Sequence, residues 1–385
     1  MDNPLPEPRY IKTPRDLVAW VDHLTDAALI AVDMESDSLH HYREKVCLIQ
    51  MTAKGEDVLI DPLALPSLVP LAGVFSDPLR CKVFHDAGYD LMSLRRDFDF
   101  KFANVFDTML ASRILGYKKF GLAAMLKGRF GFIADKRLQR SDWAMRPLSA
   151  AQIAYARYDT HFLPALYEQL KAELMAQGRL EWAQEEFSRL PEIADRSSGR
   201  VIGDIHGFWR IKHVRTLSPV AKGRLMALYR MREYLAERLD RPRFKVLSDS
   251  MLMDLAKMPP KNAEELLRPG IGRAAIERFS GEIMRALRDA QPISEMPPEG
   301  MKRRRRSGRF FDPETRERYD ALRALRSSFA ENLGLDPEVA LSNAALETLA
   351  RHPPRSVEAA LMRPELRGWR RETFAQAVVE CLVGM

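Results

Sequence analysis

The first 110 residues alternate short apolar runs with amphipathic segments. The hairpin-like turn Lys54–Asp57 lies between two of these runs, and an amphipathic segment over 88–97 predicts a helix. A mixed order of strands and helices indicates an α/β sheet with helices on its faces. The runs that predict strands are Ala28–Glu35, Lys45–Ala53, Val58–Ile60, Cys81–Phe84 and Val105–Phe106.

From about Gly121 onward the pattern is almost wholly helical. Ser149–Ala176 is one long periodic run in which Ser149 is a good N-cap and Pro164 predicts a kink or a break. After a connector over 188–207, Ser218 and Pro219 predict the start of four short helices that reach about residue 290. A second helical block over 312–383 is similar in size and order, which indicates a degenerate duplication.

A linker is expected between the two helical blocks. Residues 291–308 contain three prolines and two glycines, and they include the basic run Lys302–Arg306. A run of five cations in such a segment is typical of a solvated linker, and a strip that contacts phosphates is the alternative. Both interpretations stay open at this point.

Composition excludes several classes of protein. The chain has 385 residues, 46% hydrophobic and 29% charged, so we expect two or three ordinary globular domains. The longest apolar runs fall far short of the roughly 20 residues that a membrane span needs, and the N-terminus has no pattern of a secretory signal. The three scattered cysteines predict neither a disulfide framework nor a zinc ribbon, so we expect a cytoplasmic protein and no membrane partner.

Charge is distributed unevenly along the chain. Residues 1–200 carry 26 Lys and Arg against 28 Asp and Glu, a net charge of −2, whereas residues 201–385 carry 34 against 25, a net charge of +9. A basic half favours a polyanionic partner such as nucleic acid, although many basic surfaces are only solvated faces.

Three short motifs carry candidate chemistry. Asp33 and Glu35 lie two apart at the end of a predicted strand, so their carboxylates share a face and suit a hard divalent cation. Asp90 falls in the first turn of a predicted helix, shortly after His85. Tyr155 and Asp159 lie four apart on one helix face. Taken singly, each motif has an ordinary structural explanation; the order of all three along one chain does not.

In this combination the sequence resembles the DEDD superfamily of 3′→5′ exonucleases, in the subclass with a tyrosine before the last aspartate. More closely, it resembles the ribonuclease D family. The sequence around the motifs is similar to that of the family as well. Lys136 and Arg140 lie where the family tends to be basic. The similar segments are Lys45–Gln50, Phe84–Leu91, Phe106–Leu110 and Ser141–Leu148.

The helical half resembles HRDC domains, which are small helical modules that bind nucleic acid. Leu217–Leu287 carries the marks of one, including Pro269-Gly270-Ile271-Gly272, where Gly270 and Gly272 would let the backbone approach a phosphate. A plain inter-helix turn is the alternative for that segment. The second block has Pro364–Gly368 in its place, which leaves nucleic-acid binding by the second HRDC-like domain in doubt.

The resemblance implies a fold class and a domain order. An α/β exonuclease domain of the ribonuclease H-like type, with a mixed sheet and flanking helices, precedes two small all-α HRDC-type domains. The expected boundaries are 1–200 for the exonuclease with its connector helix, 208–291 for the first HRDC domain, 292–310 for the basic linker and 311–385 for the second HRDC-like domain.

The resemblance also implies a reaction and its residues. Two divalent ions, Mg²⁺ or Mn²⁺, would be bound by Asp33, Glu35, Asp90 and Asp159, while Tyr155 would orient the attacking water. The expected reaction is hydrolysis of RNA from its 3′ end, one nucleoside 5′-monophosphate at a time, on substrates such as tRNA precursors. The expected RNA contacts are His85, Lys136, Arg140, Gly270, Gly272, Lys302, Arg303, Arg304, Arg305 and Arg306.

Two alternatives stay open. The same catalytic set occurs in DNA-directed exonucleases, and no residue here is identified as a reader of the 2′-hydroxyl group that distinguishes RNA. A non-catalytic RNA-binding protein on the same fold is the other alternative. The sequence indicates no protein partner.

Overall fold

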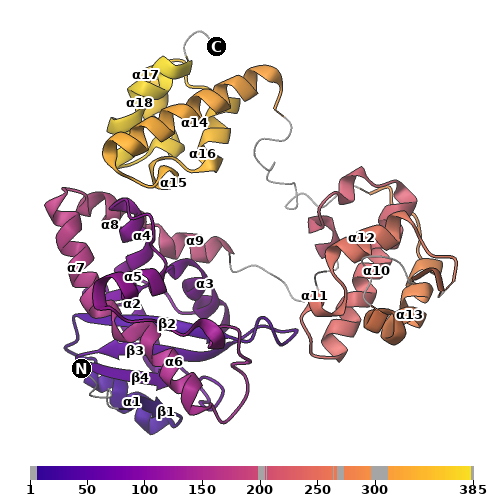
Figure 1. The fold of residues 1–385 in the computed structure, drawn as a ribbon, viewed down its shortest axis with the longest axis horizontal. Coiled ribbons are helices and arrows are strands. Elements are labelled where there is room, and N and C mark those ends of the chain that lie inside the picture. Colours follow the sequence, from indigo (N-terminus) through magenta and orange to yellow (C-terminus); the bar gives the residue numbers. More distant parts are fainter. Residues whose placement is uncertain are drawn as a thin grey trace. The chain divides into compact units, whose positions relative to one another are not determined.

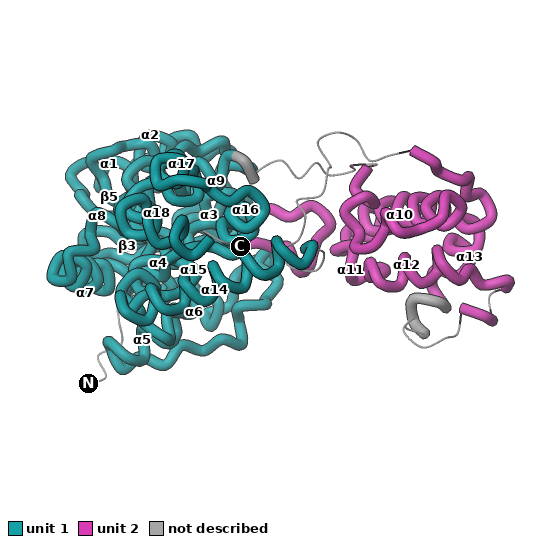
Figure 2. Tube along the Cα trace, turned by 90° about the horizontal axis from the view of Figure 1, so that it is seen from above, with its two compact units in different colours: residues 1–35, 46–198, 305–385 teal, residues 36–45, 199–304 magenta. Residues whose placement is uncertain are grey.

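The structure is a computed structural model, and it describes residues 7–197, 204, 206–262, 264–266, 273–295 and 311–382. The chain divides into two compact units (Figure 2). Residues 1–35, 46–198 and 305–385 form unit 1, and residues 36–45 and 199–304 form unit 2. Within the described part of the chain, no helix is both long and apolar enough to cross a membrane.

A six-stranded mixed sheet is the centre of unit 1 (Figure 1), with the strand order β1-β4-β3-β2-β5-β6. β1 and β4 are parallel, as are β2 with β5 and β5 with β6, whereas β3 and β4 form an antiparallel hairpin. The strands are β1 (Arg9–Ile11), β2 (Leu29–Ser36), β3 (Val46–Ala53), β4 (Glu56–Ile60), β5 (Cys81–Phe84) and β6 (Val105–Asp107).

Strand β2 shows how the sequence distributes its side chains between the two faces of the sheet. Ile30, Val32 and Met34 belong to the apolar cluster that contains side chains of helices α1 and α3, whereas Ala31 belongs to the cluster of α4, α7 and α8. Because side chains alternate along a strand, Asp33 and Glu35 share the face of Ala31 at the carboxyl end of β2.

Nine α-helices and two 3₁₀ helices are described beside the sheet in the part of unit 1 that precedes residue 198. The long periodic run is divided at Phe162, two residues before Pro164, as the sequence predicted. The predicted connector over 188–207 includes helix α9, which contacts α3. The α-helices are α1 (Pro14–His23), α2 (Ala72–Ser76), α3 (Ala87–Phe98), α4 (Thr108–Ile114), α5 (Leu122–Phe130), α6 (Ala150–His161), α7 (Leu163–Ala176), α8 (Leu180–Ser188) and α9 (Leu190–Ser197).

Unit 2 contains the first small helical domain. Ser218 caps α10 by accepting a hydrogen bond from the Ala221 amide, as predicted, but α10 has 20 residues and is not a short helix. The buried Arg232 of α10 donates to the Leu247 carbonyl at 3.1 Å and to Asp249 at 2.6 Å. The α-helices are α10 (Pro219–Arg238), α11 (Arg243–Val246), α12 (Asp249–Lys257) and α13 (Arg273–Arg288).

The second helical domain repeats this architecture and packs on α8 within unit 1. Arg326 donates to the Leu341 carbonyl at 3.0 Å and to Asn343 at 2.8 Å, with the same sequence spacing as Arg232 in the first domain. Trp369 stacks on Trp182 of α8 with ring centroids 4.5 Å apart. The α-helices are α14 (Pro313–Leu333), α15 (Pro337–Ala340), α16 (Asn343–Arg351), α17 (Val357–Leu361) and α18 (Trp369–Leu382).

Candidate active site

Three carboxylates meet between the carboxyl end of β2 and helix α6. Asp33 and Glu35 come from β2, and Asp159 comes from α6. One oxygen from each of the three lies within 4.8 Å of the others, and all three residues are half-buried. Ser149 and Gln152 form a capping box that fixes the start of α6, so the helix presents Tyr155 and Asp159 one turn apart on one side.

Asp90 approaches the same cluster from the first turn of helix α3. Only 7% of its surface is exposed, and its carboxyl group lies within hydrogen-bonding reach of Asp33. The start of α3 is fixed by Asp107, which accepts hydrogen bonds from the amides of Asp86 at 3.1 Å and Ala87 at 2.9 Å. All four predicted carboxylates are therefore brought together.

The cluster is electrostatically uncompensated within the described residues. Burial raises the pKa of Asp33 to about 7. Burial, followed by the charges of Asp33, Asp159 and Asp90, raises the pKa of Glu35 well above its usual value. Burial and the neighbouring charge of Asp33 raise the pKa of both Asp90 and Asp159. Like charges packed this closely favour protonation unless a cation joins them.

A hard divalent cation fits this donor set. Every ligand atom offered by Asp33, Glu35 and Asp159 is a carboxylate oxygen, and oxygen ligands are those that Mg²⁺ and Mn²⁺ prefer. The set has no histidine or cysteine ligand, which argues against a zinc site.

Tyr155 borders the carboxylates and is positioned by an aromatic neighbour. Its ring lies 5.9 Å from that of the buried Trp143, measured between centroids. Arg146 fixes this segment by donating to the Trp143 carbonyl and to both oxygens of Asp61. Burial and the nearby charges of Asp159, Glu35 and Asp33 raise the pKa of the Tyr155 phenol, so the hydroxyl stays protonated at neutral pH and can donate a hydrogen bond.

Comparison with known proteins identifies the domain that carries this site and the two domains that follow it. Residues 8–175 match the family model of the 3′-5′ exonuclease domain, and residues 221–287 and 315–382 each match the HRDC domain. A ribonuclease D from Gluconacetobacter diazotrophicus is 31% identical over 96% of this chain and 91% of its own length. The chain belongs to the ribonuclease D family.

Two further comparisons describe the exonuclease part and the fold. The exosome complex exonuclease RRP6 of Saccharomyces cerevisiae is 32% identical over 66% of this chain and 36% of its own length. The crystal structure of Escherichia coli RNase D has the same fold, with a TM-score of 0.72, 23% identity and coverage of 98% of this chain and 99% of that one. The predicted fold class and the duplication of the helical domain are thereby confirmed.

The RNA contacts predicted for this chain are spread over several parts of its sequence. His85 is half-buried, with Nδ1 2.9 Å from the Thr108 hydroxyl, and burial lowers its pKa to about 4. Its ring is therefore neutral at pH 7 and offers phosphate no positive charge. Lys136 and Arg140 are exposed. Gly270, Gly272 and the basic run Lys302–Arg306 lie outside the described residues.

Asp107 is a positioning residue that the sequence analysis did not single out. Besides fixing the start of α3, it caps α4 by accepting from the amides of Met109 at 2.9 Å and Leu110 at 3.1 Å. An aspartate directly before a helix is a recognisable N-cap signal for α4. Its second contact, with the helix that carries Asp90, depends on the pairing of β5 with β6 and has no local signal.

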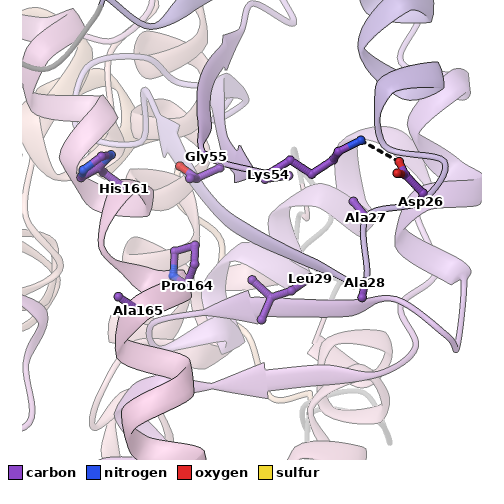
Figure 3. Close-up of a pocket in the computed structure, with 11 residues that line it drawn as sticks. Asp26, Ala27, Ala28, Leu29, Lys54, Gly55, His161, Pro164 and Ala165 are labelled. Carbon is purple, nitrogen blue, oxygen red and sulfur yellow. Dashed lines mark hydrogen bonds and ion pairs between the residues drawn. The ribbon is translucent and has the colours of Figure 1, made fainter.

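A pocket of about 370 Å³ lies at the other end of β2 (Figure 3). Its lining includes Leu29 at the start of β2, Lys54 in the β3–β4 turn and His161 at the end of α6, and Lys54 pairs with Asp26 at 2.7 Å. None of the predicted site residues lines it. The candidate chemistry therefore lies in the carboxylate cluster and not in this pocket.

Proposed function

We propose that this member of the ribonuclease D family is a metal-dependent 3′→5′ exoribonuclease that removes nucleotides one at a time from RNA 3′ ends. The observation that carries the proposal is the cluster of Asp33, Glu35, Asp90 and Asp159 in a domain of the 3′-5′ exonuclease family. Relatives named ribonuclease D and exosome complex exonuclease support RNA as the substrate. They do not favour a DNA-directed enzyme or a non-catalytic binding protein.

The four carboxylates are proposed to bind divalent cations, two ions of Mg²⁺ or Mn²⁺. Asp33, Glu35 and Asp159 form the tightest group, and Asp90 supports it from α3. Bound there, the cations supply Lewis acidity that favours ionisation of a water molecule and stabilises charge on the phosphate. Because the pKa values of Asp33 and Glu35 are raised, binding of a cation would release protons, since the carboxylates must ionise to serve as ligands.

Tyr155 is proposed to orient the attacking water. Its burial and the surrounding carboxylates raise the pKa of its phenol, so it is a poor general base at neutral pH and a good hydrogen-bond donor. The contact with Trp143 limits where the hydroxyl can point. In this role Tyr155 orients the water, whereas the carboxylates bind the divalent cations.

RNA contacts outside the cluster form the less detailed part of the proposal. Lys136 and Arg140 are exposed cations in the segment before α6, and the positions proposed beyond them are His85, Gly270, Gly272 and Lys302–Arg306. The natural substrates proposed are structured RNA 3′ ends such as those of tRNA precursors, the products nucleoside 5′-monophosphates, and the location the cytoplasm. Cys47, Cys81 and Cys381 form no disulfide, which suits a reducing compartment.

The test is a time course on a 5′-labelled RNA with an unpaired 3′ tail, run with Mg²⁺, with Mn²⁺ and with EDTA. Wild type is compared with Asp33→Ala, and with Asp26→Ala as a matched control. Asp26 is an exposed carboxylate at the opposite end of β2, where it pairs with Lys54. We expect a ladder that shortens from the 3′ end and is abolished by EDTA and by Asp33→Ala, but not by Asp26→Ala.

Three other outcomes would contradict the proposal, and each indicates a different alternative. Intact RNA under every condition, with an RNA–protein complex still visible on a gel, indicates the binding-protein alternative. Equal or faster degradation of a DNA of matched sequence indicates the DNA-directed alternative. Full activity of Asp33→Ala overturns the assignment of the cluster.

A further inference from the structure

The β2–β3 loop, residues 36–45, belongs to the same compact unit as the first HRDC domain, although it lies between two strands of the exonuclease sheet in sequence (Figure 2). It begins at the last residue of β2, directly after Asp33 and Glu35. The loop is well organised: the buried Asp37 accepts from the Lys45 amide at 2.8 Å, and the His40 and His41 amides donate to the Asp37 carbonyl. These hydrogen bonds fix the conformation of the loop, so another element can bind it in one arrangement.

An acidic surface at the end of helix α10 holds this loop. Asp240 accepts two hydrogen bonds from it, with Oδ2 2.7 Å from His41 Nδ1 and Oδ1 3.1 Å from the Tyr42 amide. Glu237 pairs with Arg43 at 2.5 Å. The Arg43 guanidinium and the carboxylate of Glu237 are complementary in charge. The hydrogen bond with His41 lowers the pKa of Asp240, so this carboxylate is ionised at neutral pH.

Tyr42 is the apolar anchor of the contact. Its ring packs against the core of the HRDC domain and lies 5.6 Å from the Arg243 guanidinium. Its hydroxyl donates to Glu233 at 3.0 Å, and Arg243 holds the same carboxylate at 2.8 Å. Glu233 is 8% exposed, so this part is shielded from solvent, whereas the Arg43–Glu237 pair is exposed and contributes little.

We propose that the first HRDC domain positions the catalytic strand: by holding the β2–β3 loop through Tyr42 and Asp240, it restrains the end of β2 and hence the placement of Asp33 and Glu35. Tyr42 lies only seven residues after Glu35. Metal ligands must be held in place by the groups behind them, and loss of such support commonly costs about 10–100-fold in metal affinity or activity. This inference rests on the proposed function, because it concerns the same carboxylates. It assigns Tyr42 and Asp240 as positioning residues.

The variants are chosen so that the contact is lost and the domain still folds. Asp240 has a φ of 45°, in the left-handed region that glycine adopts freely, so Asp240→Gly removes the carboxylate without backbone strain. Tyr42→Ala removes the anchor from the loop side, and Asp240→Asn is a milder second variant. Asp254→Ala, at an exposed position on α12 of the same domain, is the matched control. Thermal unfolding of each variant checks that the protein remains folded.

The readout separates positioning from RNA binding. Each full-length variant is assayed on an RNA dinucleotide, which is too short to span both an active site and a remote binding surface, and on a long structured RNA. We expect Asp240→Gly and Tyr42→Ala to lower kcat on the dinucleotide by about tenfold and to raise the Mg²⁺ concentration for half-maximal rate severalfold. Their combination should cost less than the product of the two single effects, because both remove one contact.

An unchanged kcat and Mg²⁺ requirement on the dinucleotide, with only KM for the long RNA raised, would overturn the proposal in favour of RNA binding by this surface. Equal losses in Asp254→Ala would also overturn it, because that residue does not contact the loop. A wild-type protein that cleaves neither substrate would instead disprove the proposed function, which is a distinguishable result.

Discussion

Helix α6 contributes to two acidic sites. They differ in whether the buried carboxylates have cationic partners. On one side, Tyr155 and Asp159 border the carboxylate cluster, where burial and like charge raise the carboxyl pKa values. On the other side, Arg157 and His161 hold the buried Asp57 at 2.6 and 2.8 Å. Burial alone would raise the pKa of Asp57, but hydrogen bonds from His161, Thr52 and Arg157 outweigh it and lower the pKa.

The difference distinguishes a structural carboxylate from a functional one. A buried carboxylate that is paired with cations and hydrogen-bonded contributes to stability. A buried carboxylate surrounded by other carboxylates destabilises the fold unless a cation compensates its charge, which is typical of a functional site. Residues two apart on a helix lie about 200° apart around its axis, so one helix keeps the two environments separate.

The largest expected effect separates the two sites by activity. Asp33→Asn should lower kcat on RNA by about 10³-fold, the order seen when one group that stabilises charge in the transition state is removed. It should not lower the free energy of unfolding in EDTA, because it relieves repulsion with Glu35, Asp90 and Asp159. Initial rates and urea unfolding in EDTA check both statements. A clearly less stable Asp33→Asn would show that the cluster is structural.

The matching change at Asp57 should reverse this pattern. Asp57→Asn leaves Arg157 and His161 without their anionic partner, and breaking a buried pair in this way costs about 3–5 kcal/mol of stability. The rate per folded molecule, measured well below the unfolding temperature, should stay within about threefold of wild type. Urea unfolding gives the first value and active-site titration the second. A large loss of kcat in a folded Asp57→Asn would mean that the two sides of α6 are coupled.

The stability gained on Mg²⁺ binding should also distinguish the two sites of α6. At a Mg²⁺ concentration 100 times the dissociation constant, a site present only in the folded state adds about 2.7 kcal/mol to stability. Wild type and Asp57→Asn should both show an increase of the unfolding temperature with added Mg²⁺, and Asp33→Asn should show little. Differential scanning calorimetry across a Mg²⁺ series measures this. Equal increases in all three proteins would place the stabilising ion elsewhere.

Local pattern predicted most of the exonuclease sheet and the repeated helical domain. The five predicted strands correspond to β2 through β6, and the helical domains recur with Arg232 and Arg326 in equivalent hydrogen bonds. Strand β1 and helix α1 were missed. β1 has three residues, and its partner β4 lies almost 50 residues away, so no short-range pattern marks it.

The site was predictable where its residues carry their chemistry in short motifs. The spacing of Asp33 with Glu35, and of Tyr155 with Asp159, is visible in the sequence because a strand or a helix fixes each pair. The second contact of Asp107 and the contact of Tyr42 with the HRDC domain were not predictable, since Tyr42 and Glu233 are 191 residues apart. Nor does the sequence show that Asp57 is paired with Arg157 and His161, because these partners lie 100 and 104 residues away along the chain.

The smallest effect expected is a difference in the sign of pH dependence. The folded-state pKa of Asp33 is raised from 3.8 to about 7, so between these pH values the folded protein binds more protons than the unfolded chain, and stability falls as pH rises. The pKa of Asp57 is lowered, so its contribution to stability is present above pH 3.8 and is lost as the pH falls below that value.

In EDTA between pH 5 and 7, the unfolding free energy of wild type should therefore decrease relative to that of Asp33→Asn, by at most about 1.4 kcal/mol per pH unit for each proton. The difference should vanish in saturating Mg²⁺, which keeps the carboxylates ionised. Urea titrations at three pH values measure this dependence, and parallel curves for wild type and Asp33→Asn would mean that Asp33 is already ionised in EDTA.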